Sequence, residues 1–152
     1  MTIAVIVHDV AKLDSGQDEH AARGAEIARE YLVRAGFSGD WIARVCQVIV
    51  NHPAALSFPS DHLPMEDRVL RDADLLDEMG AIGIIWTAMN AGWLGATSYA
   101  ETRERIVAHD RQGAEQVVAR VLTRAGREIA EQRLAFINDF VAQLDDEFGG
   151  GE

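Results

Sequence analysis

Apolar residues recur every three or four positions along most of the chain, the spacing that places them on one face of an α-helix. The first clear run follows Asp18 and ends at Gly36, a residue suited to the left-handed conformation that closes a helix. A second run begins at Ser38 or Asp40, either of which could cap it, and stops before Pro53. Strand-like alternation is absent, so the pattern predicts an all-α fold.

The same spacing predicts four more helical stretches. They are expected from Met65 to Gly80, from Ala81 to about Ala91, within residues 99–122, and from Thr123, a capping residue, through Leu144. Residues 53–64 contain all three prolines and predict a loop. Because no repeat or low-complexity tract divides the chain, residues 1–152 predict a single-domain helical bundle, with 1–10 as the remnant of a buried helix and 148–152 as a flexible tail.

The stretch from Gly80 to Ala100 carries no charge, which raises the question of a membrane span. Polar residues and glycines interrupt it, so a buried helix followed by a loop is the better interpretation and no membrane association is expected. Its aromatic residues, Trp86, Trp93 and Tyr99, could stack on a nucleobase, but the expectation is that they belong to the core.

Composition excludes one class of partner. Fourteen Lys and Arg against 25 Asp and Glu give a net charge of −11, and such a surface repels phosphate backbones, which argues against general nucleic-acid binding. The single cysteine, Cys46, cannot form an internal disulfide and is expected to be a packed thiol. With no export signal at the start, the chain is predicted to be cytoplasmic.

Five side chains at helix ends or on apolar faces could carry chemistry. His8 and Asp9 end the apolar stretch of residues 3–7, where ionisable groups are costly unless they are paired or bind a metal. Asp74 lies in an apolar run and needs a cation partner. His20 and His52 could contact metal or substrate, or could serve only as hydrogen-bond partners of the ligands.

The order and spacing of these residues resemble the HD-domain superfamily of metal-dependent phosphohydrolases. The resemblance rests on His8-Asp9-Val10-Ala11-Lys12, then His20, His52, Asp72-Ala73-Asp74 and Gly80-Ala81-Ile82-Gly83-Ile84, and it covers about residues 4–147. Within the superfamily, the chain is most similar to small bacterial hydrolases that resemble nucleotide pyrophosphohydrolases.

The resemblance implies a ligand set. His8, Asp9 and Asp74 would hold a divalent metal, with His20 and His52 able to hold a second one. The family has a further histidine on an upstream helix; only seven residues precede His8, so that helix is expected to be missing from this chain. Loss of a helix would expose apolar surface on its neighbours, which predicts a homodimer.

The predicted reaction is hydrolysis of a small phosphorylated molecule, with a nucleotide as one candidate. Imidazole and carboxylate ligands suit Mn²⁺, Fe²⁺, Co²⁺, Ni²⁺ or Zn²⁺, and Mg²⁺ is also considered. Asp9, Lys12, His20 and His52 are the predicted catalytic residues, and Lys12, before Arg71 or Arg23, is the preferred source of positive charge for phosphate. Two alternatives stay open: an HD-domain oxygenase with two irons, and a catalytically impaired binding protein.

Overall fold

The computed structural model describes residues 2–13, 19–53 and 62–149, and every regular element in these ranges is helical. The predicted all-α fold is therefore confirmed. The chain consists of two compact units, Met1–Asp72 and Ala73–Glu152, each with its own hydrophobic cluster. No helix in the described ranges is long and apolar enough to cross a membrane.

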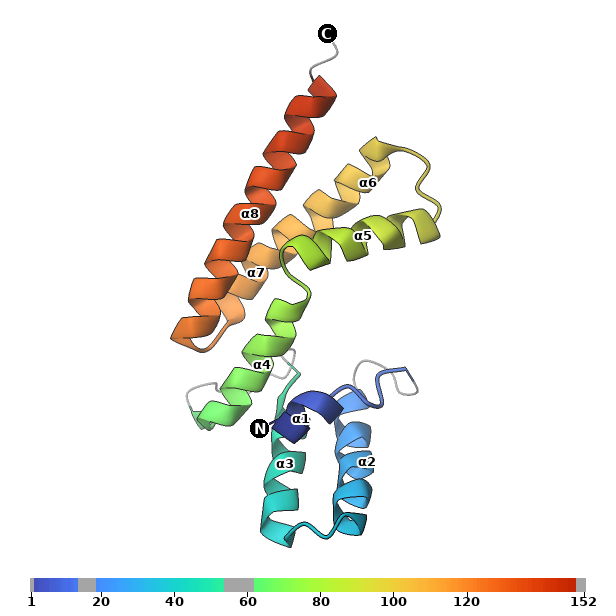
Figure 1. Cartoon of the computed structure of the whole chain (residues 1–152). Helices are drawn as coiled ribbons and strands as arrows, with labels where there is room; N and C mark the ends of the chain where they lie inside the picture. The colour runs from blue at the N-terminus through green and yellow to red at the C-terminus, as the bar shows by residue number, and fades with distance from the viewer. Residues whose placement is uncertain (1, 14–18, 54–61, 150–152) are drawn as a thin grey trace. The chain divides into compact units, whose positions relative to one another are not determined.

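The first unit is built on a helical hairpin. α2 (His20–Arg34) and α3 (Gly39–Asn51) lie side by side, and the short α1 (Thr2–Val7) packs against α3 (Figure 1). Gly36 ends α2 with a positive φ of 80°, as its position in the sequence predicts. Ser38, one of the two predicted cap residues, occupies the N-cap position of α3, although its side chain makes no capping hydrogen bond there.

The buried side chains of this hairpin form the first core. Apolar residues of α2 spaced three and four apart face those of α3, which is the periodicity that the sequence showed. Cys46 is buried here, and its thiol donates to the carbonyl of Ala25 at 3.4 Å, which confirms the expected packed thiol. The cluster comprises Ala4, Ala25, Ala28, Leu32, Ile42, Val45, Cys46, Val48, Ile49 and Leu70.

α4 (Met65–Asp77) starts in the first unit and is attached to α3 by a buried carboxylate. Asp67 is completely buried, forms an ion pair with Arg44, and accepts a hydrogen bond from Asn51 Nδ2 at 2.8 Å. Two donors compensate the desolvation that a buried charge suffers. This arrangement fixes the end of α3, where His52 follows Asn51.

The second unit contains the remaining helices. After Gly80, whose φ is 82°, come α5 (Ala81–Trp93), α6 (Tyr99–Arg105), the π-helix η2 (Ile106–Arg111), α7 (Gln112–Arg120) and α8 (Arg124–Gly149). Ser98 Oγ and Thr123 Oγ1 accept hydrogen bonds from backbone N–H groups at the starts of α6 and α8, so the predicted cap at Thr123 is confirmed. The second core comprises Leu76, Met79, Ile84, Ile106, Ala114, Val121, Ala130, Ile137 and Val141.

α5 differs from its prediction. It is buried only along the face of Gly83, Ile84, Thr87 and Ala91, while large apolar side chains cover its other side. Trp86 is 64% exposed, Trp93 88% and Tyr99 81%, so the expectation that these aromatic residues belong to the core is wrong. Three of the four residues on the buried face are small, and Ile84 is the exception. The number of apolar residues in a helix therefore does not indicate which of its faces is buried.

Two predicted segments fall largely outside the described residues. These are residues 54–61 of the predicted loop and residues 150–152 of the predicted tail, whereas α8 continues to Gly149.

α1 presents Ile3, Ala4 and Val7 to the core, but Val5 and Ile6 are 43% and 73% exposed.

Candidate metal centre

The first part of the site is the turn that follows α1. Residues 8–13 form this turn and bring His8, Asp9 and Lys12 to one place, with the main-chain N–H of Lys12 donating to the carbonyl of Asp9 at 2.9 Å. Ala11 is completely buried and holds the turn against the unit. On the facing helix, a Cβ added at Gly24 would lie 3.1 Å from the carbonyl oxygen of His8, so a glycine there lets the turn approach α2 closely.

The second part comes from the ends of α2 and α3. His20 is the first residue of α2, and His52 directly follows the last residue of α3. Both are buried, with 5% and 1% of their surface exposed, and their Nε2 atoms are 3.2 Å apart. Each ring is thus the polar partner of the other, as buried polar groups require.

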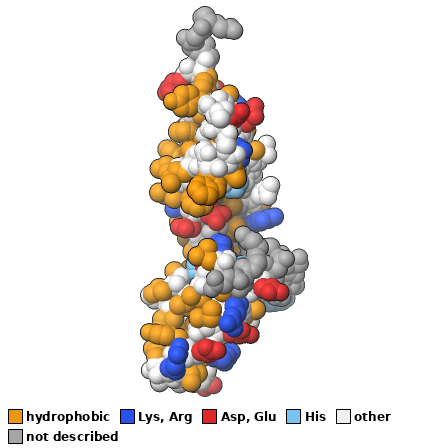
Figure 2. Space-filling model, turned by 90° about the vertical axis from the view of Figure 1, so that its right-hand side faces the viewer, with side chains coloured by type: hydrophobic (Ala, Val, Ile, Leu, Met, Phe, Trp, Pro, Cys, Tyr) orange, Lys and Arg blue, Asp and Glu red, His pale blue; other side chains and the backbone are white. Residues whose placement is uncertain are grey.

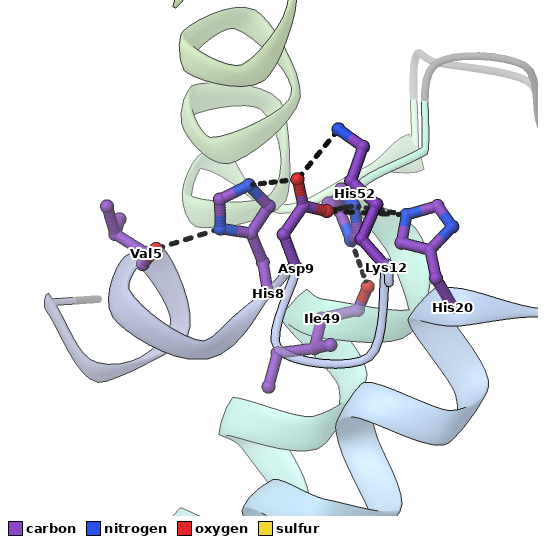
Figure 3. A network of polar contacts seen from close by, with 7 residues as sticks. All are labelled: Val5, His8, Asp9, Lys12, His20, Ile49 and His52. Atoms are coloured by element: carbon purple, nitrogen blue, oxygen red, sulfur yellow. Dashed lines mark hydrogen bonds and ion pairs between the residues drawn. The ribbon is translucent and has the colours of Figure 1, made fainter. Parts of the chain in front are cut away.

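Asp9 lies at the centre of these groups (Figure 3). Its Oδ1 is 3.5 Å from His20 Nε2 and 3.6 Å from His52 Nε2, while its Oδ2 accepts a hydrogen bond from Lys12 Nζ at 2.8 Å and lies 3.7 Å from His8 Nε2. Oδ1 is buried and accepts no hydrogen bond from the described residues. The structure thus brings together four residues singled out from the sequence, together with the predicted cation Lys12.

Two main-chain carbonyls determine which ring nitrogens face Asp9. His8 Nδ1 is 2.8 Å from the carbonyl oxygen of Val5, and His52 Nδ1 is 2.5 Å from that of Ile49. A carbonyl oxygen can only accept, so each Nδ1 carries the proton and each neutral ring has its lone pair on Nε2. These are the atoms that a metal ion requires, and a hydrogen bond on the other nitrogen is the usual support of a metal-binding histidine.

Both carbonyls belong to residues three positions before the histidine that they orient. The last turn of a helix leaves carbonyl groups without intrahelical partners, so a histidine just beyond a helix end can donate to one of them. Sequence reasoning missed Val5 and Ile49, although the signal was present. His8 and His52 each directly follow a predicted helix end.

One ligand atom from each of His8, Asp9 and His52 lies within 4.8 Å of the other two, so the group could hold a metal ion. An unsatisfied buried carboxylate oxygen and two oriented imidazole lone pairs are the donor chemistry that a divalent transition metal prefers. The residues present therefore fit such an ion.

Electrostatics keeps Asp9 ionised. Burial alone would raise its pKa, but the hydrogen bond and charge of Lys12, together with the neighbouring His8 and His52 side chains, outweigh burial, and the pKa of Asp9 lies below its usual value. The carboxylate is thus in the state that binds cations.

The group of ligand atoms from His8, Asp9 and His52 does not include the other predicted residues, Asp74, Arg71 and Arg23. Asp74 is half-buried on α4 and belongs to the second unit, so its role as a ligand stays a prediction. Arg71 is buried, and this burial lowers its pKa. Arg23 is exposed and forms an ion pair with Glu26 at 2.7 Å, which compensates its charge. Lys12 is therefore the cation placed at the donor group.

Comparison with known proteins agrees with the fold. The chain is similar to the uncharacterized protein YpgQ of Bacillus subtilis strain 168, with 28% identity over 97% of this chain and 71% of that protein. The crystal structure of YpgQ matches with a TM-score of 0.61 and 22% identity, over 96% of this chain and 85% of the other. The Lin1889 protein of Listeria innocua matches with a TM-score of 0.63 and 17% identity, over 99% and 87%. The family model of the HD domain matches residues 1–79, just over half of the chain and the part that contains the donor group, so the chain belongs to the HD-domain family.

Proposed function

We propose that the chain is a metal-dependent phosphohydrolase that hydrolyses a small phosphorylated molecule, with nucleotides as the first candidates. The observation that carries this proposal is the arrangement of His8, Asp9 and His52, with Lys12 Nζ 2.8 Å from the same aspartate. A cation site beside a lysine suits a phosphate ester, because a molecule of net charge −11 otherwise repels such a substrate. Membership of the HD-domain family supports the reaction class.

His8, Asp9 and His52 would hold a divalent ion, which would supply a bound water of lowered pKa for attack on phosphorus. The protein contributes the geometry. The carbonyls of Val5 and Ile49 keep the Nε2 atoms of His8 and His52 directed at Asp9, so no proton has to move before a cation binds. Oδ1 of Asp9 has no hydrogen-bond donor to displace.

Lys12 has two tasks in this proposal. Its ammonium holds Asp9 in the carboxylate form, and it offers a positive charge to the phosphoryl group of the substrate. Because Lys12 is partly exposed, it can reorient from Asp9 toward a substrate without unfolding the turn.

His20 takes a supporting role. His52 presents a lone pair at Nε2, so His20 Nε2 carries the hydrogen in the 3.2 Å contact between the two rings. A cation at His52 Nε2 would take the lone pair that accepts this hydrogen bond, so in the loaded centre His20 would support the site through Asp9, whose Oδ1 lies 3.5 Å from His20 Nε2. The same pair of histidines is the observation that favours the second candidate, an oxygenase with two irons, since additional imidazoles would be needed for a second metal.

The first experiment measures metal content and hydrolysis together. Protein purified without added metal is analysed for Mn, Fe, Co, Ni and Zn. It is then assayed with Mn²⁺ for release of phosphate or pyrophosphate from nucleotides and from p-nitrophenyl phosphate. We expect about one equivalent of metal and measurable turnover, both lost in Asp9→Asn and both kept in Asp139→Asn, an exposed acid on α8.

The outcome separates the candidates. Full phosphatase activity in Asp9→Asn contradicts the proposal. Close to two irons per chain, with oxygen consumption in place of phosphate release, supports the oxygenase. Absence of metal and turnover after incubation with Mn²⁺ or Fe²⁺ supports the impaired binding protein.

Asp74 is proposed as a further ligand on the sequence motif alone. Its test is the metal content of Asp74→Ala, with Glu78→Ala as the control because Glu78 is an exposed acid four residues further on. Metal loss in Asp74→Ala alone supports the assignment, and equal metal content in both variants contradicts it.

A further inference from the structure

We infer that the exposed face of α5 is the contact surface of a homodimer in which two copies of this chain pair through the same stripe of side chains. The stripe is defined by Ile82, Ile85, Trp86, Met89 and Trp93, whose exposed fractions are 68%, 56%, 64%, 67% and 88%. Their spacing of three and four residues places them along one side of the helix. Hydrophobic side chains form broad orange areas on the surface that Figure 2 shows.

The size of the stripe is that of an interface. The largest apolar patch of a typical monomer measures about 300–600 Å². Two tryptophans and three aliphatic side chains exposed to this degree offer on the order of 800 Å², about what each partner contributes to a standard interface. Aromatic residues and methionine are the types enriched in such contacts. Exposure of this face to water is therefore unfavourable, and its burial in a contact would stabilise the complex.

Charge favours a second copy as the occupant. A net charge of −11 opposes the association of two identical molecules over most of their surface. The segment from Gly80 to Ala100 is free of charged residues, so pairing through α5 brings no like charges together at the centre of the contact. A two-fold axis also needs only one patch, because each copy supplies the same surface.

A groove lies beside the stripe and shares Trp86 with it. It has a volume of about 320 Å³ and is lined by Trp86, Asn90, Leu94, Arg105 and His109, among others. Arg105 and His109 border the apolar stripe, so the groove side chains add no acidic charge to the contact between two acidic molecules.

The two-fold symmetry of such a dimer predicts which residues lie close to the same residues of the second copy. In an antiparallel pairing of α5 with α5, residues near the middle of the stripe lie next to the two-fold axis. The middle of the stripe falls between Trp86 and Met89, so a cysteine at position 89 would lie near the two-fold axis and near its counterpart across the interface. Cys46 is 4% exposed and stays out of the reaction.

The test measures mass and cross-linking on the full chain. Sedimentation equilibrium of the wild type at micromolar concentration should give the mass of a dimer, and Trp93→Glu should give that of a monomer. Val33→Glu is the matched control, since Val33 is an apolar residue on α2 with 61% exposure, and it should stay dimeric. Met89→Cys should form a disulfide-linked dimer on mild oxidation, much faster than Ile129→Cys on α8, where Ile129 is 40% exposed.

Each outcome either supports or contradicts a dimer formed through α5. A monomeric wild type overturns the inference, and so does a Trp93→Glu protein that remains a dimer. If Trp93→Glu fails to fold, as judged by its circular dichroism, cross-linking decides: rapid disulfide formation in Met89→Cys supports the α5 interface, and a rate no faster than that of Ile129→Cys contradicts it. The result is independent of the hydrolase proposal, because none of these variants changes a residue of the metal centre.

Discussion

His8 and His52 each donate a hydrogen bond from Nδ1 to a main-chain carbonyl and thereby direct Nε2 toward Asp9. The identity of these two histidines could be predicted from the sequence, because each follows a helix end. Their tautomers could not, since the protonated nitrogen depends on which carbonyl each ring reaches. The metal proposal relies on that detail.

His52 and His20 should differ in how much each matters for metal binding. His52 belongs to the group of ligand atoms within 4.8 Å, whereas His20 contacts His52 and Asp9. Removing a supporting residue usually lowers metal affinity by about 10- to 100-fold. We expect His20→Ala to fall in this range and His52→Ala to lose more, with Mn²⁺ titration calorimetry as the measurement. His62→Ala, at an exposed histidine, is the control. Equal losses for His20 and His52 would indicate that both are ligands.

Lys12 should separate cation binding from phosphate chemistry. Its ammonium repels a metal ion at Asp9 but attracts a phosphoryl group, so Lys12→Gln should leave Mn²⁺ affinity unchanged or stronger. Turnover of the phosphorylated substrate should fall about tenfold or more, as loss of one charge-assisted contact implies. Kinetics and calorimetry on the same sample measure both effects. Arg23→Gln should change neither, and a parallel loss of metal and activity in Lys12→Gln contradicts the assigned role.

At the scale of elements, helix positions could largely be predicted from the sequence, but their close approaches could not. The hairpin of α2 and α3 and the capped start of α8 follow their predictions. The π-helix η2 within residues 99–122 was not foreseen, because a π turn inserts a residue into the helical period that the apolar pattern assumes. Gly24 likewise stood out only once the turn beside it was located.

Gly24 lets α2 approach the turn that carries His8 and Asp9. Gly24→Ala removes the low helix propensity of glycine, worth about 1 kcal/mol, yet its Cβ would lie 3.1 Å from the carbonyl oxygen of His8. We expect the turn to shift by a few tenths of an ångström and Mn²⁺ affinity to fall about tenfold, since ligands depend on their supporting contacts. Gly113→Ala has nothing within 4 Å of its Cβ and should only stabilise the protein. Unchanged metal affinity in both variants would remove Gly24 from this role.

η2 contains a buried acid with a measurable pH signature. Asp110 is 5% exposed and its Oδ2 has no hydrogen-bond partner among the described residues. Burial raises its pKa above the ordinary 3.8, although a hydrogen bond from Thr87 opposes this shift. A raised pKa in the folded state means that the contribution of Asp110 to stability is complete below the unfolded pKa and is lost as the pH rises through the folded one.

Asp110→Asn should therefore be more stable than the wild type at pH 7, by about 1 kcal/mol, because the amide bears no charge to bury. The advantage should shrink as the pH falls through the raised pKa of Asp110, because the wild-type carboxyl becomes protonated there. Urea unfolding at several pH values measures the difference, with Asp139→Asn on exposed α8 as a control that should show little pH-dependent gain. A constant difference across the pH range would rule out the titration of Asp110 as its cause.

At the scale of the whole molecule, the spacing of apolar residues predicted the helical class but not the distribution of apolar surface. The charge-free segment from Gly80 to Ala100 was expected to form a buried helix followed by a loop. The structure buries one face of this helix, with Ile84, and exposes most of its large residues, Trp86 and Trp93 among them. Hydropathy records the polarity of each side chain and not its direction, so an interface helix and a core helix look alike in the sequence.

A metal ion that binds only the folded chain should stabilise the whole molecule. Because His8 and His52 come from different parts of the sequence, the unfolded chain cannot present them together with Asp9, and binding adds to the free energy of unfolding. At a free Mn²⁺ concentration of about 100 times the dissociation constant, the gain should be about 2.7 kcal/mol. Urea unfolding with Mn²⁺, and again with excess chelator, measures it.

Two variants identify where that gain originates. Asp9→Asn should unfold at the same urea concentration with Mn²⁺ and with chelator, since the neutral amide lacks the carboxylate charge that attracts the cation between the histidines. Ile137→Ala, which opens space at a completely buried position of the second core, should lower the free energy of unfolding by about 2–5 kcal/mol and still show the full increment from Mn²⁺. Stabilisation of Asp9→Asn as large as that of the wild type would mean that Mn²⁺ acts at another place on this acidic chain.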